Sequence, residues 1–214
     1  RHKNGLWSNW SSGFEFSIVQ PGDILNSFSA PNNSPWGVVV DPNTGNLISS
    51  DFGTGTIYVH QGISSQITNN FDSPSSLPYG ITFDPNTGNL ISVDNGTDKI
   101  YIHDGISSTN TNNFSSPGNQ PRGLTVDPNG NLISINGSTN KIYIHQGISS
   151  QITNNFDSPG SGPFGVTIDL NDNLISTGFE SSTNKIYVHD GISSQITNSF
   201  SSPGTSPRGL TIDP

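Results

Sequence analysis

A phrase of about 43 residues recurs along the whole 214-residue chain. Each copy begins with Pro-x-Gly and a short β-prone run, continues with Gly-Asn-Leu-Ile-Ser or a close variant, and then reads Ile-Tyr-Val/Ile-His. A repeat of this length that holds four strand-like runs is typical of one blade of a β-propeller. The sequence therefore predicts an all-β propeller of four-stranded antiparallel blades, and the repeat is marked by Gly37, Gly80, Gly123, Gly165 and Gly209.

The second copy shows the expected order of strands and turns. Residues 80–84, 89–93, 99–103 and 111–114 are short runs of β-prone residues, and the third run alternates with a period of two. Between them lie Pro-Asn-Thr-Gly and other turn sequences, in which Pro and Gly supply the backbone angles that tight turns need. No stretch of useful length has helical periodicity, so the pattern favours four strands per unit.

The two ends of the chain together hold the pieces of one more blade. The C-terminal residues 207–214 supply a single innermost strand, while the N-terminal runs 4–8, 16–19 and 24–28 resemble the second, third and fourth strands. Closing the ring in this way would remove an exposed sheet edge. We therefore expect a single domain of five blades, and the alternative is a fragment of a propeller with six or more. The expected blades are residues 36–78, 79–121, 122–163, 164–206, and a composite of 207–214 with 1–35.

Composition and charge argue against several partners. The formal net charge is −9, with only seven Lys and Arg residues, whereas nucleic-acid binding needs a basic surface. No apolar run is long enough to cross a bilayer, so we expect no membrane insertion. The chain has no cysteine, which rules out disulfides and thiolate chemistry. No cofactor is expected.

Residues 78–105 resemble an NHL repeat, and the blade pattern is also similar to those of streptogramin lyase and the gluconolactonase group. The resemblance covers essentially the whole chain and implies a propeller. It does not imply one function, because such folds carry enzymes, receptors and scaffolds. Two features depart from the NHL pattern: we count five blades rather than six, and the basic face of RNA-binding members is missing.

A histidine recurs at one position of the third strand, as His60, His103, His145 and His189. Packed sheets lie about 10 Å apart, whereas ligands of one metal must meet at a single point. We therefore expect these rings to pack between blades beside the neighbouring tyrosines, and we expect no metal site. Likewise, the Asp that follows each innermost strand is expected to cap its own turn rather than to bind calcium; these are Asp41, Asp84, Asp127, Asp169 and Asp213.

The residue between Pro and Gly is where the repeats differ most in chemistry. It opens the innermost strand beside the axis, where equivalent positions converge. Aromatic rings and two arginines there fit a sugar ring, a carboxylate or a peptide. The alternative is that they plug the mouth of the channel and stack on neighbouring blades. The candidate ligand-binding residues are Trp36, Tyr79, Arg122, Phe164 and Arg208.

The sequence favours a non-enzymatic binding or scaffolding propeller at the cell surface or outside the cell, with a carbohydrate, peptide or protein ligand. A metal-dependent lactonase or lyase is the first alternative. Asp51, Asp94 and Asn136 follow the second strand and could face one rim, but the only glutamates are Glu15 and Glu180. A structural module that assembles with other proteins of a surface layer or filament is the second alternative. Candidate glycosylation sites, each in an Asn-x-Ser/Thr sequence, are Asn9, Asn32, Asn95, Asn113 and Asn136.

Overall fold

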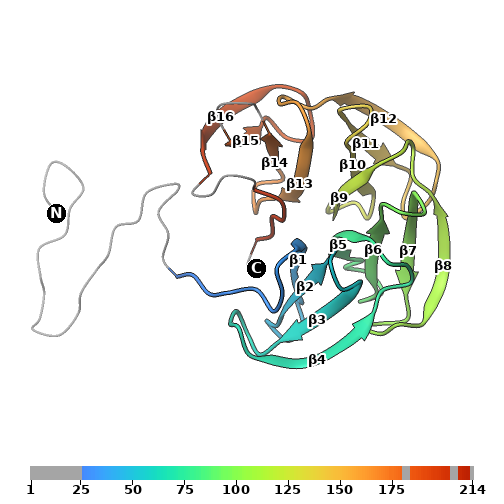
Figure 1. Ribbon diagram of the computed structural model, residues 1–214. Coiled ribbons are helices and arrows are strands. Elements are labelled where there is room, and N and C mark those ends of the chain that lie inside the picture. Colours follow the sequence, from blue (N-terminus) through green and yellow to red (C-terminus); the bar gives the residue numbers. More distant parts are fainter. Residues whose placement is uncertain (1–25, 180–183, 203–206, 213–214) are drawn as a thin grey trace, which may run out of the picture.

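The computed structural model describes residues 26–179, 184–202 and 207–212. Within these ranges the chain forms sixteen strands in four antiparallel sheets and no helix. Each sheet has four strands in sequence order, from the innermost strand at the axis to the outermost strand at the rim (Figure 1). The predicted propeller of four-stranded antiparallel blades is therefore confirmed.

The four blades follow the four full copies of the repeat in sequence order. The first blade is β1 (Pro35–Val40), β2 (Leu47–Asp51), β3 (Thr56–His60) and β4 (Ile67–Asp72). The second is β5 (Pro78–Phe83), β6 (Leu90–Asp94), β7 (Lys99–His103) and β8 (Asn110–Ser115). The third is β9 (Pro121–Val126), β10 (Leu132–Asn136), β11 (Lys141–His145) and β12 (Ile152–Asp157). The fourth is β13 (Pro163–Ile168), β14 (Leu174–Phe179), β15 (Asn184–His189) and β16 (Ile196–Ser201).

Turn chemistry fixes where the first two strands of each blade meet. Gly88, for example, has a φ of 72°, a left-handed conformation that glycine adopts without steric cost. The fourth blade has Asp172 at this turn, with a φ of 63°, and Asp is among the few other residues that tolerate this region. The expected capping is also present, because the Asp84 carboxylate accepts hydrogen bonds from the Asn86 amide at 3.0 Å and the Thr87 hydroxyl at 2.7 Å.

The core consists of three apolar layers, one between each pair of neighbouring blades. Between the first and second blades, Ile48 and Ile57 pack with Ile81 and Leu90, and all four are buried. The layers are thin because each sheet contributes one face to each neighbour. This arrangement explains how a chain with only 29% hydrophobic residues forms a core.

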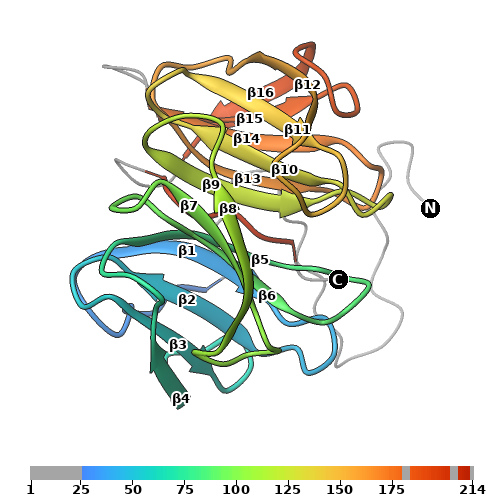
Figure 2. The same ribbon diagram turned by 90° about the vertical axis from the view of Figure 1, so that its right-hand side faces the viewer.

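The predicted fifth blade is described only in part. Its N-terminal runs 4–8 and 16–19 lie outside the described residues, as do Asp213 and Glu180. Residues 207–212 are described and form no strand, yet they lie beside the axis between β13 and β1 (Figures 1 and 2). The four described blades occupy an arc around the axis, and this C-terminal segment lies between the two ends of that arc.

Candidate functional site

The five residues between Pro and Gly converge on one face of the propeller, as predicted. The Trp36 and Tyr79 rings are stacked, with centroids 3.8 Å apart and an interplanar angle of 16°. Phe164 meets Trp36 edge-on at 5.3 Å. The guanidinium carbon of Arg122 lies 4.2 Å from the centre of the Phe164 ring, and that of Arg208 lies 4.0 Å from the Trp36 ring. We call these five residues the central cluster.

The glycine that follows each of these residues brings the innermost strands together. A Cβ on Gly80 would collide with the carbonyl oxygen of Arg122 in the next blade, and a Cβ on Gly37 would meet the carbonyl oxygen of Tyr79 in the same way. Glycine is therefore required for packing at these positions. Only about 10 Å³ of free space remains on the axis between the innermost strands. The axis therefore has no open channel beneath the central cluster.

Residues of a second repeat position, which the sequence did not point to, contact the central cluster. Phe52, directly after β2, contacts Tyr79 edge-on at 5.4 Å and Trp36 at 6.0 Å. In the third blade the equivalent residue is Gly137, where a Cβ would collide with the Arg122 guanidinium. The residue after the second strand therefore lies against the central cluster in both blades.

Both faces of the Trp36 indole ring are occupied. Tyr79 stacks on it at 3.8 Å and the Arg208 guanidinium lies 4.0 Å from its centre, so the two must lie on opposite faces. Trp36 therefore holds other members of the central cluster in place, and it has no free face on which a sugar ring could stack. The contacts of Trp36 agree with the alternative expectation, in which these side chains stack on neighbouring blades. All five side chains nevertheless remain partly exposed.

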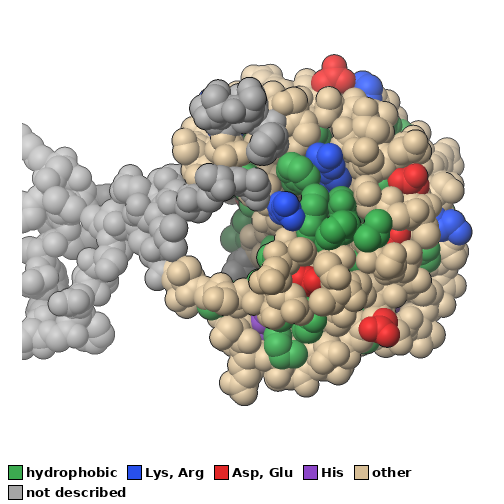
Figure 3. Space-filling view, viewed as in Figure 1, with side chains coloured by type: hydrophobic (Ala, Val, Ile, Leu, Met, Phe, Trp, Pro, Cys, Tyr) green, Lys and Arg blue, Asp and Glu red, His purple; other side chains and the backbone are tan. Residues whose placement is uncertain are grey.

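The central cluster carries positive charge on a protein of net charge −9. Arg122 donates to the carbonyl oxygen of Pro163 at 3.2 Å, and its buried Nε has no hydrogen-bond partner. Within the described ranges, neither arginine forms an ion pair; the one found joins Lys141 and Asp157 at the rim. Burial raises the pKa of Tyr79, while the nearby positive charges of Arg122 and Arg208 act in the opposite direction. Figure 3 shows blue side chains beside the green central patch.

The repeated histidines are buried. Packing between blades was expected, and the ring contacts that show it are with fourth-strand phenylalanines of the preceding blade. His103 Nδ1 lies 2.7 Å from the Ser107 carbonyl oxygen, which can only accept, so this nitrogen carries the proton. Nε2 then accepts from the Ser92 hydroxyl at 2.8 Å. The ring also contacts Phe71 of the preceding blade, with centroids 6.0 Å apart. The other blades repeat these contacts at His60, His145 and His189.

The acidic residues that end the second strands accept hydrogen bonds from nearby backbone amides and a threonine hydroxyl. Asp94 accepts from the Thr97 amide and hydroxyl through Oδ1, at 2.8 and 3.0 Å, and from the Leu77 amide through Oδ2 at 2.8 Å. Asp51 makes equivalent contacts in the first blade. Among the residues that the structure describes, no three His, Asp or Glu side chains are grouped closely enough to hold a metal ion.

The candidate glycosylation sites differ in exposure. Asn32 and Asn113 are exposed and Asn95 is partly exposed, whereas Asn9 lies outside the described residues. Asn136 has 0% exposure, and its Oδ1 accepts from the amides of Ser138 and Thr139, both at 3.1 Å. The folded blade therefore leaves no room for a glycan at Asn136. None of the described residues forms a helix long and apolar enough to span a membrane.

Comparison with known proteins supports the fold alone. No family model and no curated protein sequence matches the chain, so membership of the NHL-repeat family stays a prediction. Among solved structures, the chain is similar to Myxococcus xanthus glutaminyl cyclase, with a TM-score of 0.69, 15% identity, and coverage of 86% of this chain and 83% of that one. It is also similar to Kuenenia stuttgartiensis hydrazine synthase, with a TM-score of 0.59 and 14% identity. That match covers 83% of this chain and spans about half (52%) of the hydrazine synthase chain.

Proposed function

We propose that this chain is a non-enzymatic binding or scaffolding propeller at the cell surface or outside the cell, and that its central cluster binds a carbohydrate or peptide that carries a carboxylate. The observation that carries the proposal is the convergence of the five positions where the repeats differ most. The neighbouring Pro and Gly of each repeat preserve the fold, whereas the residue between them varies in chemistry at the one place where all repeats meet.

The contacts within the central cluster favour an anionic ligand. The guanidinium groups of Arg122 and Arg208 each lie over an aromatic ring, which restricts their movement, and both side chains remain partly exposed. A guanidinium group held in this way is suited to donate two parallel hydrogen bonds to a carboxylate. Because both faces of Trp36 are covered, stacking on its indole ring is not available as the main source of affinity.

Matched pairs of acidic and neutral probes test this proposal. We expect tetragalacturonic acid, or a Glu-rich peptide, to bind the full chain more tightly than galactotetraose or the matching Gln-rich peptide, as measured by isothermal titration calorimetry. Arg208→Gln, Trp36→Ala and Tyr79→Ala should each weaken that binding at least tenfold while leaving the far-ultraviolet circular dichroism unchanged. Leu170→Ala is the control, because this 81% exposed side chain lies near the opposite end of the axis.

Two results would overturn the proposal. One is equal affinity for the acidic and neutral member of both pairs. The other is unchanged affinity in the folded Arg208→Gln and Trp36→Ala proteins. The remaining alternatives have their own signatures: a divalent ion bound on the axis by Asp or Asn side chains would favour a lactonase or lyase. A periodic assembly seen by electron microscopy would favour a structural module.

A further inference from the structure

We propose that residues 4–19 of this chain fill the groove between the fourth and first blades and complete a fifth blade, with Pro207–Ile212 as its innermost strand. This inference does not depend on the ligand of the central cluster. It rests on the positions of two described segments, residues 207–212 and residues 26–31, which lie where the first and fourth strands of such a blade belong.

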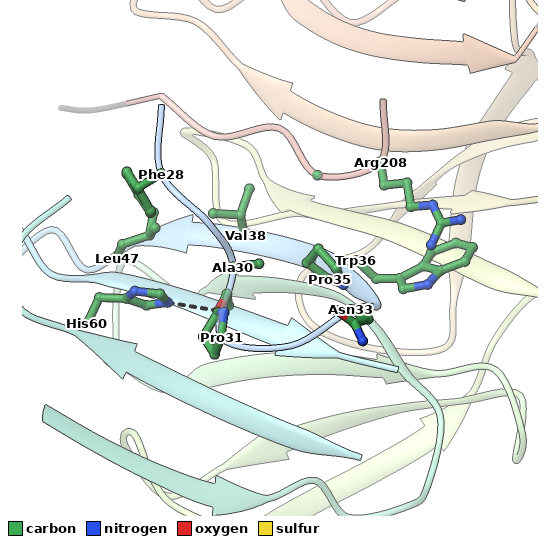
Figure 4. Close-up of a pocket in the computed structure, with 13 residues that line it drawn as sticks. Phe28, Ala30, Pro31, Asn33, Pro35, Trp36, Val38, Leu47, His60 and Arg208 are labelled. Atoms are coloured by element: carbon green, nitrogen blue, oxygen red, sulfur yellow. Dashed lines mark hydrogen bonds between the residues drawn. The ribbon is translucent and has the colours of Figure 1, made fainter. Parts of the chain in front are cut away.

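A groove of about 530 Å³ separates the first blade from the C-terminal segment. Val38, Leu47 and His60 of the first blade form one wall, and Arg208 and Gly209 belong to the other (Figure 4). The lining is mainly apolar, as are the layers between the other blades. An apolar surface of this kind is expected to be covered in the folded protein.

Residues 207–212 occupy the place of a fifth innermost strand. A Cβ on Gly165 would collide with the carbonyl oxygen of Arg208, just as a Cβ on Gly80 would collide with that of Arg122. On the other side, a Cβ on Gly209 would lie 3.0 Å from the carbonyl oxygen of Trp36. The innermost segments therefore close a ring of five around the axis, although only four of them belong to described blades.

Phe28 occupies the place of a fourth-strand residue. In the described blades, a fourth-strand Phe packs on the histidine of the next blade, with ring centroids 6.0 to 6.1 Å apart. Phe28 packs on His60 of the first blade at 6.4 Å. The segment that contains Phe28 therefore lies where the outermost strand of a preceding blade would lie. This segment belongs to the same molecule as the first blade.

The second and third strands of this fifth blade have no described segment in their place. In each described blade the innermost strand pairs with a second strand, whereas residues 207–212 form no strand pairing within the described part of the chain. From Leu6 to Phe28 there are 23 residues, close to the 25 from Leu47 to Phe71, the stretch that runs from the start of the second strand to the fourth-strand Phe of the first blade. Within the first of these stretches, Leu6-Trp7-Ser8 matches Leu-Ile-Ser of the second strands. The segment is also tethered beside the groove at Asn26, which favours it over a separate chain.

The described blades fix the register that this pairing must have. The second-strand serine is paired with the apolar residue that follows Pro-x-Gly, as in Ile81 with Ser92 and Val166 with Ser176. The equivalent pair in the fifth blade is Leu210 with Ser8. Adjacent residues of a strand point to opposite faces of the sheet, so Ser8 and Thr211 would point apart.

An engineered disulfide tests both the occupant and the register. The chain has no cysteine, so any disulfide that forms must join introduced thiols, either within one molecule or between two copies. After mild oxidation of the full chain, Ser8→Cys/Leu210→Cys should form an intramolecular disulfide, detected by peptide mapping and migrating as a monomer on a non-reducing gel. The control Ser8→Cys/Thr211→Cys should stay reduced, because disulfides require the two Cβ atoms to approach within about 4.5 Å.

Three outcomes would overturn the inference: no disulfide in the first variant, equal oxidation of both variants, or a covalent dimer, which would show that a second copy fills the groove. Hydrogen exchange of the unmodified chain provides a second test that needs no variant. The amides of Leu210 and Ile212 should exchange within tenfold of the rates at Leu124 and Val126. Exchange at the rates of an unfolded chain would show that residues 207–212 have no partner strand.

Discussion

The guanidinium carbon of Arg208 lies 4.0 Å from the centre of the Trp36 indole ring, and this contact joins the C-terminal segment to the innermost strand of the first blade. Cation–π pairs with Trp are the strongest of their kind. The same contact also fixes an arginine of the proposed ligand site. Stability of the ring and organisation of the site therefore depend on one pair of side chains.

We predict a coupling free energy of about 1 kcal/mol between Arg208 and Trp36. It would be measured by a double-mutant cycle of Arg208→Gln, Trp36→Leu and the double variant, with urea unfolding as the readout. Arg208 with Leu170→Ala serves as the reference pair, because the exposed Leu170 lies near the opposite end of the axis. Additive effects for Arg208 and Trp36, within about 0.3 kcal/mol, would contradict the prediction.

Gly80→Ala should destabilise the propeller by about 3 kcal/mol or more, because the new methyl group would overlap the backbone of the third blade. The matched control is Gly147→Ala, where φ is 60° and no atom lies within 4 Å of a Cβ. That change should cost only about 1 kcal/mol, the price of a left-handed conformation. Denaturant midpoints of the two variants provide the measurement. Equal losses would show that the innermost strands do not pack as closely as the structure indicates.

The blades could be predicted from the sequence because their determinants are local and repeated. The third strand Lys99–His103 has the predicted bounds, and the other strands of that blade differ by one or two residues. The central cluster could be predicted because symmetry alone brings equivalent positions together at an axis. Its internal contacts could not, since the stacking of Trp36 between Tyr79 and Arg208 depends on side-chain rotation.

Contacts between the innermost strand and the residue after the second strand were the main source of error. Phe52 contacts Trp36 of its own repeat and Tyr79 of the next, and Gly137 lies against Arg122 of its own repeat. These residues are 15 to 27 positions apart in the sequence, so neither the period of a strand nor a turn motif indicates that they meet.

The burial of Asn136 was missed for a different reason. The sequence Asn-Gly-Ser is typical of an exposed turn. The Asn136 side chain instead lies inward and accepts hydrogen bonds from the amides of that turn.

Acid should destabilise the fold through its buried histidines. Burial lowers the pKa of His103, His145 and His189, and the bond from each ring to a backbone carbonyl only partly opposes this. The unfolded chain therefore binds more protons than the folded one below about pH 6.5. The stability that these groups contribute is present above that pH and is lost as pH falls through the lowered pKa values.

Each such histidine should add up to about 1.4 kcal/mol per pH unit to the slope of unfolding free energy against pH below 6.5. Urea unfolding of His103→Gln at several pH values from 7 to 5 should show a slope smaller by that amount. Tyr101→Phe is the control, because it changes the same strand without removing a group that titrates in this range. An unchanged slope in His103→Gln would mean that this ring does not resist protonation.

The last prediction concerns Asp94 and Asn136, which occupy one repeat position with different chemistry. Asp94 Oδ2 accepts from the Leu77 amide at 2.8 Å. In the third blade the corresponding amide belongs to Gln120, whose φ of 60° turns it toward Asp98, where it donates at 2.9 Å. The Gln120 amide is therefore not available to a carboxylate oxygen at residue 136. In the described part of the chain the Asn136 Nδ2 occupies that place, buried and without a hydrogen-bond partner.

Both isosteric exchanges should therefore destabilise the protein, for opposite reasons. Asp94→Asn would place an amide NH₂ group against the Leu77 N–H and should cost about 1–3 kcal/mol. Asn136→Asp would bury a carboxylate oxygen without a donor and should cost at least as much at pH 7. Urea unfolding of both variants, with Asn113→Asp on the exposed strand β8 as the control, measures these losses. A stabilising effect of Asn136→Asp would show that its blade can supply the missing donor, and would contradict the role assigned to Gln120.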